Sequence, residues 1–198
     1  MATASTMLPL GTKVPDFTLP DVRTGESVSV GDFGEKGLLV VFICNHCPYV
    51  KLVQPGLVEL GRDYRDRDVA IVGIAPNDAI AYPEDAPAEL ARVADRLGYE
   101  FPVLYDESQE VARAFTAACT PDFFLFDADR ALVYRGQFDG SRPGNGVEVT
   151  GESVRAALED LLADRPISDD QRPSLGCSIK WKAEGEAISL GKRQGGPN

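Results

Sequence analysis

Four stretches of the chain are apolar at almost every position, which is the pattern of a strand buried on both faces of a sheet. The two longer stretches are residues 38–44 and 69–75, and the two shorter ones are residues 102–105 and 123–126. All are far shorter than the roughly 20 apolar residues that a membrane-spanning helix needs. The pattern therefore predicts a central sheet that is covered by helices on both faces.

Between and after these strands, apolar residues recur every three or four positions, as one face of a helix requires. Helices are expected around residues 50–60, 90–97, 108–115 and 154–162. Pro55 lies inside the first helix and predicts a kink, because proline removes a helical hydrogen bond. Gly98 is a natural end for the second helix, and Thr150 or Ser153 is the expected cap of the last.

The order of these elements predicts an α/β fold with a largely parallel centre. A loose leader of residues 1–16 precedes an N-terminal hairpin within residues 17–30, and a closing hairpin lies within residues 123–134. Residues 1–163 are expected to form one domain. Residues 164–198 have little periodicity, and we expect an irregular tail that packs on this domain.

Composition and charge narrow the function. The 198 residues are 43% hydrophobic and carry a formal net charge of −11. Such a surface repels phosphate backbones and anionic lipids, so neither nucleic acid nor a membrane is an expected partner. Residues 1–15 lack the basic flank and continuous apolar region of a signal peptide, and we expect a cytoplasmic protein. Four cysteines in such a chain indicate reactive, metal-binding or buried thiols rather than a disulfide framework.

The segment Cys44-Asn45-His46-Cys47-Pro48 joins the first buried strand to the first helix. A helix N-terminus offers unpaired N–H groups and a partial positive charge, both of which favour a thiolate over a thiol. Pro48 suits the first helical position, where no backbone donor is missed. We therefore predict that Cys47 is a nucleophile with a low pKa, in a helix start that is open to solvent.

Several segments resemble the peroxiredoxin-like branch of the thioredoxin superfamily, close to the alkyl hydroperoxide reductase/thiol-specific antioxidant proteins. They are residues 42–51 (FICNHCPYVK), 119–127 (CTPDFFLFD), 134–137 (YRGQ) and 176–181 (GCSIKW). The resemblance extends over about residues 10–182. It implies a thioredoxin-like three-layer sandwich, in which helices flank a central mixed sheet with an N-terminal hairpin and an inserted strand-helix segment.

The resemblance also implies roles for particular residues. Proteins of the thioredoxin fold carry a cis-proline before a strand, where it faces the active cysteine and offers backbone groups to an extended substrate. In this chain that position falls on Thr120 and Pro121. The implied activity is thiol-disulfide exchange or peroxide reduction, with a protein disulfide or a peroxide as substrate. A thiol such as thioredoxin or glutathione would act as reductant, and no cofactor is implied.

Two departures from these relatives decide which chemistry to test. Cys47 falls on the first cysteine of thioredoxin, but Val50 stands where its second cysteine would be. The peroxiredoxin pattern Pro-x-x-x-Thr/Ser-x-x-Cys is also not met, because Val40 and Cys44 occupy the proline and threonine positions. Another thiol must then resolve an oxidised Cys47. Cys44 is our first choice and Cys119 our second. Cys177, which would arrive from the tail, is the remaining alternative, and a structural role or none is its default.

Other roles stay open at this point. His46, the only histidine, is either a base or charge partner for Cys47 or an exposed loop residue. Arg142 is a candidate to hold a thiolate or a substrate carboxylate. The favoured function is a thiol-disulfide oxidoreductase of antioxidant type, monomeric or dimeric. The alternatives are a peroxidase with a non-standard pocket and a copper or zinc carrier that uses Cys44, His46 and Cys47.

Overall fold

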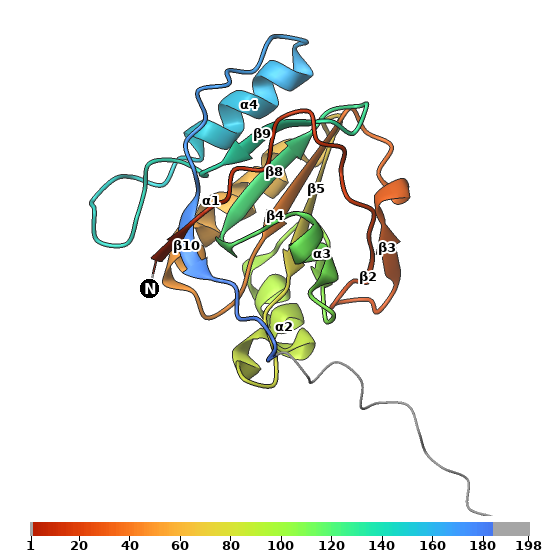
Figure 1. Cartoon of the computed structure of the whole chain (residues 1–198), viewed down its shortest axis with the longest axis vertical. Coiled ribbons are helices and arrows are strands. Elements are labelled where there is room, and N and C mark those ends of the chain that lie inside the picture. Colours follow the sequence, from red (N-terminus) through yellow and green to blue (C-terminus); the bar gives the residue numbers. More distant parts are fainter. Residues whose placement is uncertain (1, 184–198) are drawn as a thin grey trace, which may run out of the picture.

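The structure is a computed structural model that describes residues 2–183. A five-stranded mixed sheet with the strand order β6-β5-β4-β8-β9 forms its centre (Figure 1). Strands β4, β5 and β6 run parallel, and β8 and β9 continue the sheet in antiparallel pairing. The strands are β4 (Gly37–Phe42), β5 (Val69–Ala75), β6 (Val103–Tyr105), β8 (Asp122–Phe126) and β9 (Leu132–Gly136).

Strand β4 shows why the sheet has two covered faces. Every residue of β4 is buried, and its side chains alternate between two apolar clusters, as the period of a strand requires. Leu39 and Val41 belong to one cluster, whereas Leu38, Val40 and Phe42 belong to the other. The two faces explain why this segment has no polar position, and the three-layer arrangement that was predicted is confirmed.

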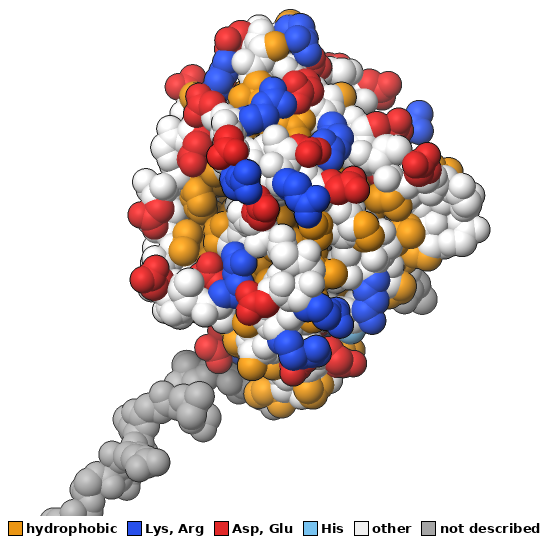
Figure 2. Space-filling view, turned by 180° about the vertical axis from the view of Figure 1, so that it is seen from behind, with side chains coloured by type: hydrophobic (Ala, Val, Ile, Leu, Met, Phe, Trp, Pro, Cys, Tyr) orange, Lys and Arg blue, Asp and Glu red, His pale blue; other side chains and the backbone are white. Residues whose placement is uncertain are grey.

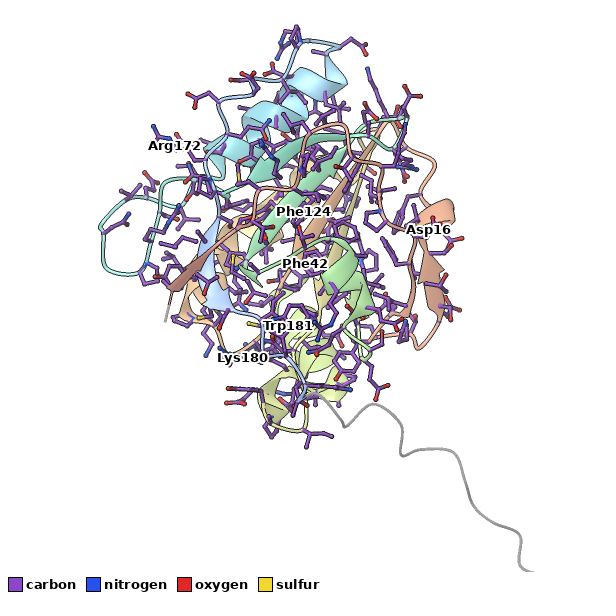
Figure 3. The ribbon with its side chains drawn as sticks, in the orientation of Figure 1. Asp16, Phe42, Phe124, Arg172, Lys180 and Trp181 are labelled. Carbon is purple, nitrogen blue, oxygen red and sulfur yellow. The ribbon has the colours of Figure 1, made fainter. Side chains whose placement is uncertain are left out.

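Helices cover both faces of the sheet. The cluster with Leu39 and Val41 is closed by α1 (Pro48–Tyr64) and α4 (Glu152–Leu162). The cluster with Phe42 is closed by α3 (Glu110–Ala114) and by a hairpin of β2 (Thr18–Pro20) and β3 (Ser27–Ser29). Phe42 and Phe124 pack edge to face in its centre, with ring centroids 5.8 Å apart (Figure 3).

The helix boundaries follow the sequence signals with one exception. Helix α1 continues through Pro55, and α2 (Pro87–Leu97) ends at Gly98, whose φ of 74° is left-handed as expected. The cap of α4 is Gly151, so the prediction of Thr150 or Ser153 is wrong. No side-chain cap is needed there, because the carbonyl of Phe138 accepts the N–H groups of Ser153 and Val154.

A second, three-stranded sheet was not predicted. Its order is β1-β10-β7, and all pairing is antiparallel. Its strands are β1 (Ala2–Ala4), β10 (Leu175–Ser178) and β7 (Cys119–Thr120), and Figure 1 shows β1 and β10 side by side at one edge of the molecule. The predictions of a loose leader and of an irregular tail are therefore wrong for Ala2–Ala4 and Leu175–Ser178, which form paired strands. Residues 184–198 of that tail lie outside the described residues.

Charged side chains of both signs share the surface of the protein (Figure 2). On the face shown in Figure 2, basic and acidic side chains are interspersed and neither sign forms a continuous field. Within residues 2–183, no helix is long and apolar enough to cross a bilayer.

Candidate active site

Cys47 lies at the junction between the core strand and the first helix. It is the N-cap of α1, with extended backbone angles, and Pro48 takes the first helical position as predicted. Cys47 is 0% exposed, which corrects the expectation of an open helix start. Its sulfur lies 3.2 Å from the Thr120 carbonyl oxygen, to which it donates a hydrogen bond only while Cys47 is protonated. Thr120 on β7 and the neighbouring strand β10 cover a helix end that would otherwise face solvent.

The surroundings of Cys47 favour its thiolate. The pKa of Cys47 is lowered to about 5, first because the Cys44 thiol donates a hydrogen bond to it. The Cys177 thiol and the backbone N–H groups of Val50 and Cys177 lower the pKa further, against the effect of burial. The N–H of Val50 belongs to the first turn of α1, which is the contribution expected of a helix N-terminus.

Cys44 occupies the deep side of the same cluster. It is 2% exposed, and its sulfur lies 3.1 Å from the Thr120 hydroxyl. The pKa of Cys44 is strongly raised, first by its hydrogen bond to Cys47, then by burial and by the negative charge of Asp85. Cys44 therefore stays protonated and serves Cys47 as a hydrogen-bond donor.

Thr120 connects the two thiols through two different groups. Its carbonyl accepts from Cys47, its hydroxyl pairs with Cys44, and the Thr120–Pro121 peptide bond that follows is cis. Cys119 is also buried, but its thiol is directed to the carbonyl of Pro121 at 3.7 Å. Burial raises the pKa of Cys119 above the usual thiol range. Cys119 is thus near the cluster without a thiol contact in it.

His46 is turned towards a carboxylate. Its Nδ1 lies 2.6 Å from Asp85, and its ring stacks on Tyr82 with centroids 5.0 Å apart. Asp85 is fully buried and also accepts hydrogen bonds from the Asn45 N–H at 2.7 Å and the Asn77 amide at 2.8 Å. The structure therefore gives His46 a positioning role in this loop and no hydrogen bond to Cys47 among the described residues.

Comparison with known proteins places this geometry in a family. The model of the AhpC/TSA family matches residues 10–135. The chain belongs to the AhpC/TSA family. A solved structure of an uncharacterized conserved protein from Geobacillus kaustophilus is 55% identical, with a TM-score of 0.91 over 92% of this chain and 97% of that one.

Two curated relatives carry functional names. Peroxiredoxin Bcp of Escherichia coli is 31% identical over 156 residues, which cover 72% of this chain and 92% of Bcp. Thiol-disulfide oxidoreductase ResA of Bacillus thuringiensis is 23% identical over 153 residues, which cover 77% of this chain and 76% of ResA. The chain is thus a peroxiredoxin-like protein of the thioredoxin superfamily, and these similarities support a redox function.

Not every predicted site residue joins the cluster in this AhpC/TSA protein. Arg142 donates to the carbonyls of Asp139 and Ser141 and to the side chain of Gln137, at 2.6–2.8 Å. These contacts tie its guanidinium to its own loop. Among the described residues, no hydrogen bond joins Arg142 to a thiol.

The possible metal ligands in the structure differ from those predicted for a copper or zinc carrier. Atoms of Cys44, His46 and Asp85 lie within 4.8 Å of one another, so Asp85 takes the place that was predicted for Cys47. These atoms already have partners in Thr120 and in one another, and a closed zinc site uses four ligands. The trio fits a structural network better than a metal carrier.

Sequence reasoning missed two residues of the site. Asp85 stands in an acidic, proline-rich loop with no periodicity, so no sequence signal singles it out. Cys177 was only the remaining candidate for a resolving thiol, with a structural role or none as its default, although its segment GCSIKW carried part of the family resemblance. That resemblance was the available signal. It marked the segment as a family feature but did not place Cys177 near Cys47.

Proposed function

We propose that this chain is a thiol-disulfide oxidoreductase in which the Cys47 thiolate attacks a disulfide substrate. The observation that supports it best is the thiolate environment of Cys47, at the N-terminus of α1 with Cys44 as hydrogen-bond donor. With a pKa of about 5, Cys47 is mostly ionised at neutral pH, and the thiolate is the reactive form of cysteine. The four cysteines are free thiols, which supports a reducing, cytosolic compartment.

The reaction is a sequence of thiol-disulfide exchanges. The Cys47 thiolate attacks one sulfur of the substrate disulfide, forms a mixed disulfide and releases the other sulfur as a thiolate. A second protein thiol then attacks Cys47, which releases the remaining substrate thiol and leaves a disulfide in the protein. A dithiol or glutathione-type reductant returns the protein to its reduced form.

Peroxide reduction is the second candidate, and the similarity to peroxiredoxin Bcp favours it. The immediate surroundings of Cys47 favour it less. The peroxiredoxin threonine position holds Cys44, and the hydroxyl of Thr120 is already paired with that thiol. The described residues therefore supply no free hydroxyl beside Cys47 that is comparable to the one in the peroxiredoxin pattern.

Stopped-flow kinetics distinguish the two substrates. The reduced protein is mixed with a small aromatic disulfide or with hydrogen peroxide, and the loss of free Cys47 is followed by trapping and peptide mapping. We expect the rate of the reaction with the disulfide to be nearly constant above about pH 6, because a Cys47 with a pKa of about 5 is already ionised there, whereas the rate of an ordinary free thiol still rises up to about pH 8.5. Cys47→Ser should abolish this reaction, and Cys119→Ser, which alters a buried thiol outside the cluster, should retain it. Consumption of Cys47 by peroxide alone would favour the peroxidase.

A further inference from the structure

Strand β10 lies along the loop that holds Cys47. Cys177 is the register partner of Thr120, and Ser178 is the partner of Cys119. The contact continues at both ends, where the Ile179 N–H donates to Ala118 at 3.1 Å and the Ser174 hydroxyl donates to Pro121 at 2.7 Å. The chain's own C-terminal segment therefore covers the edge that the family resemblance assigns to an extended substrate.

The approach of β10 to this edge is close. A Cβ atom at Gly176 would lie only 2.0 Å from the Thr120 carbonyl oxygen, so a glycine is required for the strand to fit. Cys177 follows Gly176, and it packs against the apolar cluster that contains Cys44 and Cys47. Its thiol and its N–H lie close enough to the Cys47 sulfur to stabilise a thiolate there.

We propose that Cys177 is the resolving thiol, and that β10 delivers it to Cys47 from the position of an extended substrate. The inference rests on the proposed function of Cys47. Because Cys47 is 0% exposed with β10 in place, a substrate must first separate β10 from β7. The return of β10 after the first exchange then brings Cys177 back to the mixed disulfide.

The second step of the reaction, resolution of the mixed disulfide, follows from this placement of Cys177. Cys177 loses its proton, and its sulfur attacks the Cys47 sulfur of the mixed disulfide. The Cys47–Cys177 disulfide forms as the bond to the substrate breaks, and the substrate leaves as a thiolate that takes up a proton. The substrate disulfide is thereby reduced by two electrons and the two protein thiols are oxidised.

The competing choice is Cys44, which the sequence favours. Cys44 is buried at the base of the cluster with its sulfur on the Thr120 hydroxyl, whereas Cys177 is only half-buried on a strand. Cys177 is thus the more accessible of the two.

The chain beyond β10 is anchored so that the strand can return to one register. The Lys180 N–H donates to the Asn77 side chain at 2.9 Å, and Gln109 donates to the Lys180 carbonyl at 2.8 Å. The guanidinium carbon of Arg113 lies over the Trp181 ring, 4.4 Å from the ring centroid. Figure 3 labels Lys180 and Trp181 at this end of the molecule. These contacts hold the segment while β10 itself moves.

The test uses the full reduced chain and one equivalent of 4,4′-dithiodipyridine, a small neutral disulfide. Attack by Cys47 releases a first thiopyridone, and resolution by a second thiol releases another, so the two steps appear as two absorbance phases. Cys177→Ser keeps a hydroxyl donor beside Cys47 and removes only the resolving sulfur. Cys44→Ser tests the rival thiol, and Ser178→Ala is a matched control on the same strand.

We expect the parent chain, Ser178→Ala and Cys44→Ser to release the second thiopyridone. Peptide mapping of each should show a Cys47–Cys177 disulfide. In Cys177→Ser the second phase should slow at least about tenfold, and the mixed disulfide should persist on Cys47. Circular dichroism and thermal unfolding of each variant report folding, and Cys177→Ala repeats the test without a hydroxyl.

Two results would overturn the inference in different ways. If Cys177→Ser and Cys177→Ala release the second thiopyridone at the parent rate and yield a Cys44–Cys47 disulfide, Cys44 resolves and the proposed function stands. If the parent chain shows no fast labelling of Cys47, the proposed function itself fails. A persistent mixed disulfide that maps to Cys47 only in the two Cys177 variants supports the inference.

Discussion

The five-stranded and the three-stranded sheet meet at Cys47, and different interactions stabilise them. Strand β4, which leads to Cys47, is buried at every position and belongs to both apolar clusters. Strand β10, which covers Cys47, has four residues, is half-buried along most of its length and is flanked by the short strands β1 and β7. Burying one large apolar side chain contributes about 1.5–3 kcal/mol, whereas a net hydrogen bond contributes about 0.5–1.5 kcal/mol.

From this difference we expect Cys47 to become mobile only on global unfolding, because the strand that leads to it is fully buried, and we expect β10 to open locally. A rigid Cys47 keeps its thiolate environment, whereas a movable β10 admits a substrate. If the two regions are separable, substitutions in β10 should change access to Cys47 without unfolding the five-stranded sheet.

Gly176→Ala should separate the two regions most strongly. The new methyl would meet the Thr120 carbonyl oxygen at 2.0 Å, and a backbone atom cannot rotate away as a side chain does. We expect β10 to lose its pairing with β7, at a cost of about 3 kcal/mol, and alkylation of Cys47 at pH 8 to accelerate at least about tenfold. Iodoacetamide kinetics with peptide mapping measure this.

Gly34→Ala is the matched control for that prediction, because a Cβ there meets nothing within 4 Å and no left-handed φ is involved. Its alkylation rate should equal that of the parent chain. An unchanged Cys47 rate in Gly176→Ala would show that β10 does not limit access, and the comparison between the two sheets would lose its functional meaning.

Asp122→Asn tests the place where the sheets join. Asp122 on β8 pairs with Phe42 of β4, and Ser5, just after β1, donates to its carboxyl at 3.1 Å. Burial raises the pKa of Asp122 to about 8. In the unfolded chain this group ionises near pH 4, so the free energy of unfolding should fall as pH rises from about 4 to 8.

The asparagine cannot ionise and keeps an oxygen for Ser5. We expect Asp122→Asn to be more stable than the parent chain at pH 7.5, and this advantage should be much smaller at pH 4.5. Urea unfolding at the two pH values gives the difference. An equal difference at both would mean that the carboxyl does not titrate between them, and the stated cause would be rejected.

Cys44→Ala tests the deep side of the cluster alone. The Cys44 thiol is the largest cause of the low pKa of Cys47, so its removal should raise that pKa from about 5 by about one unit, which corresponds to about 1.4 kcal/mol. Cys44→Ser retains a donor and should shift the pKa less. The pH dependence of Cys47 alkylation measures both variants. If Ala and Ser gave the same pKa as the parent, hydrogen bonding by residue 44 would not control the thiolate.

The sequence predicts the region that apolar burial builds. The uninterrupted runs in 38–44 and 69–75 identify β4 and β5, and the junction after β4 places Cys47 at a helix start. The alternation of strands and helices along the chain follows as well. These features can be predicted because, in these segments, an apolar residue indicates a buried position.

The region that covers Cys47 is built differently and stays hidden in the sequence. Strands β1 and β10 pair through backbone groups with partners far away in the chain, and residues 175–178 show no alternation of apolar and polar positions. The burial of Cys47 therefore depends on a contact that no local pattern encodes. Asp85 is hidden for the same reason, since its partners Asn45 and His46 come from another loop.

Arg113→Ala tests the anchor beyond β10 and should have the smallest effect. The guanidinium of Arg113 lies over the ring of Trp181, which is 38% exposed, and such an exposed cation–π contact contributes about 0.5–1 kcal/mol. We expect a small loss of stability and an increase in Cys47 alkylation of less than about fivefold, because Asn77 and Gln109 still hold Lys180. An increase as large as that in Gly176→Ala would show that the anchor, rather than the pairing with β7, keeps β10 closed.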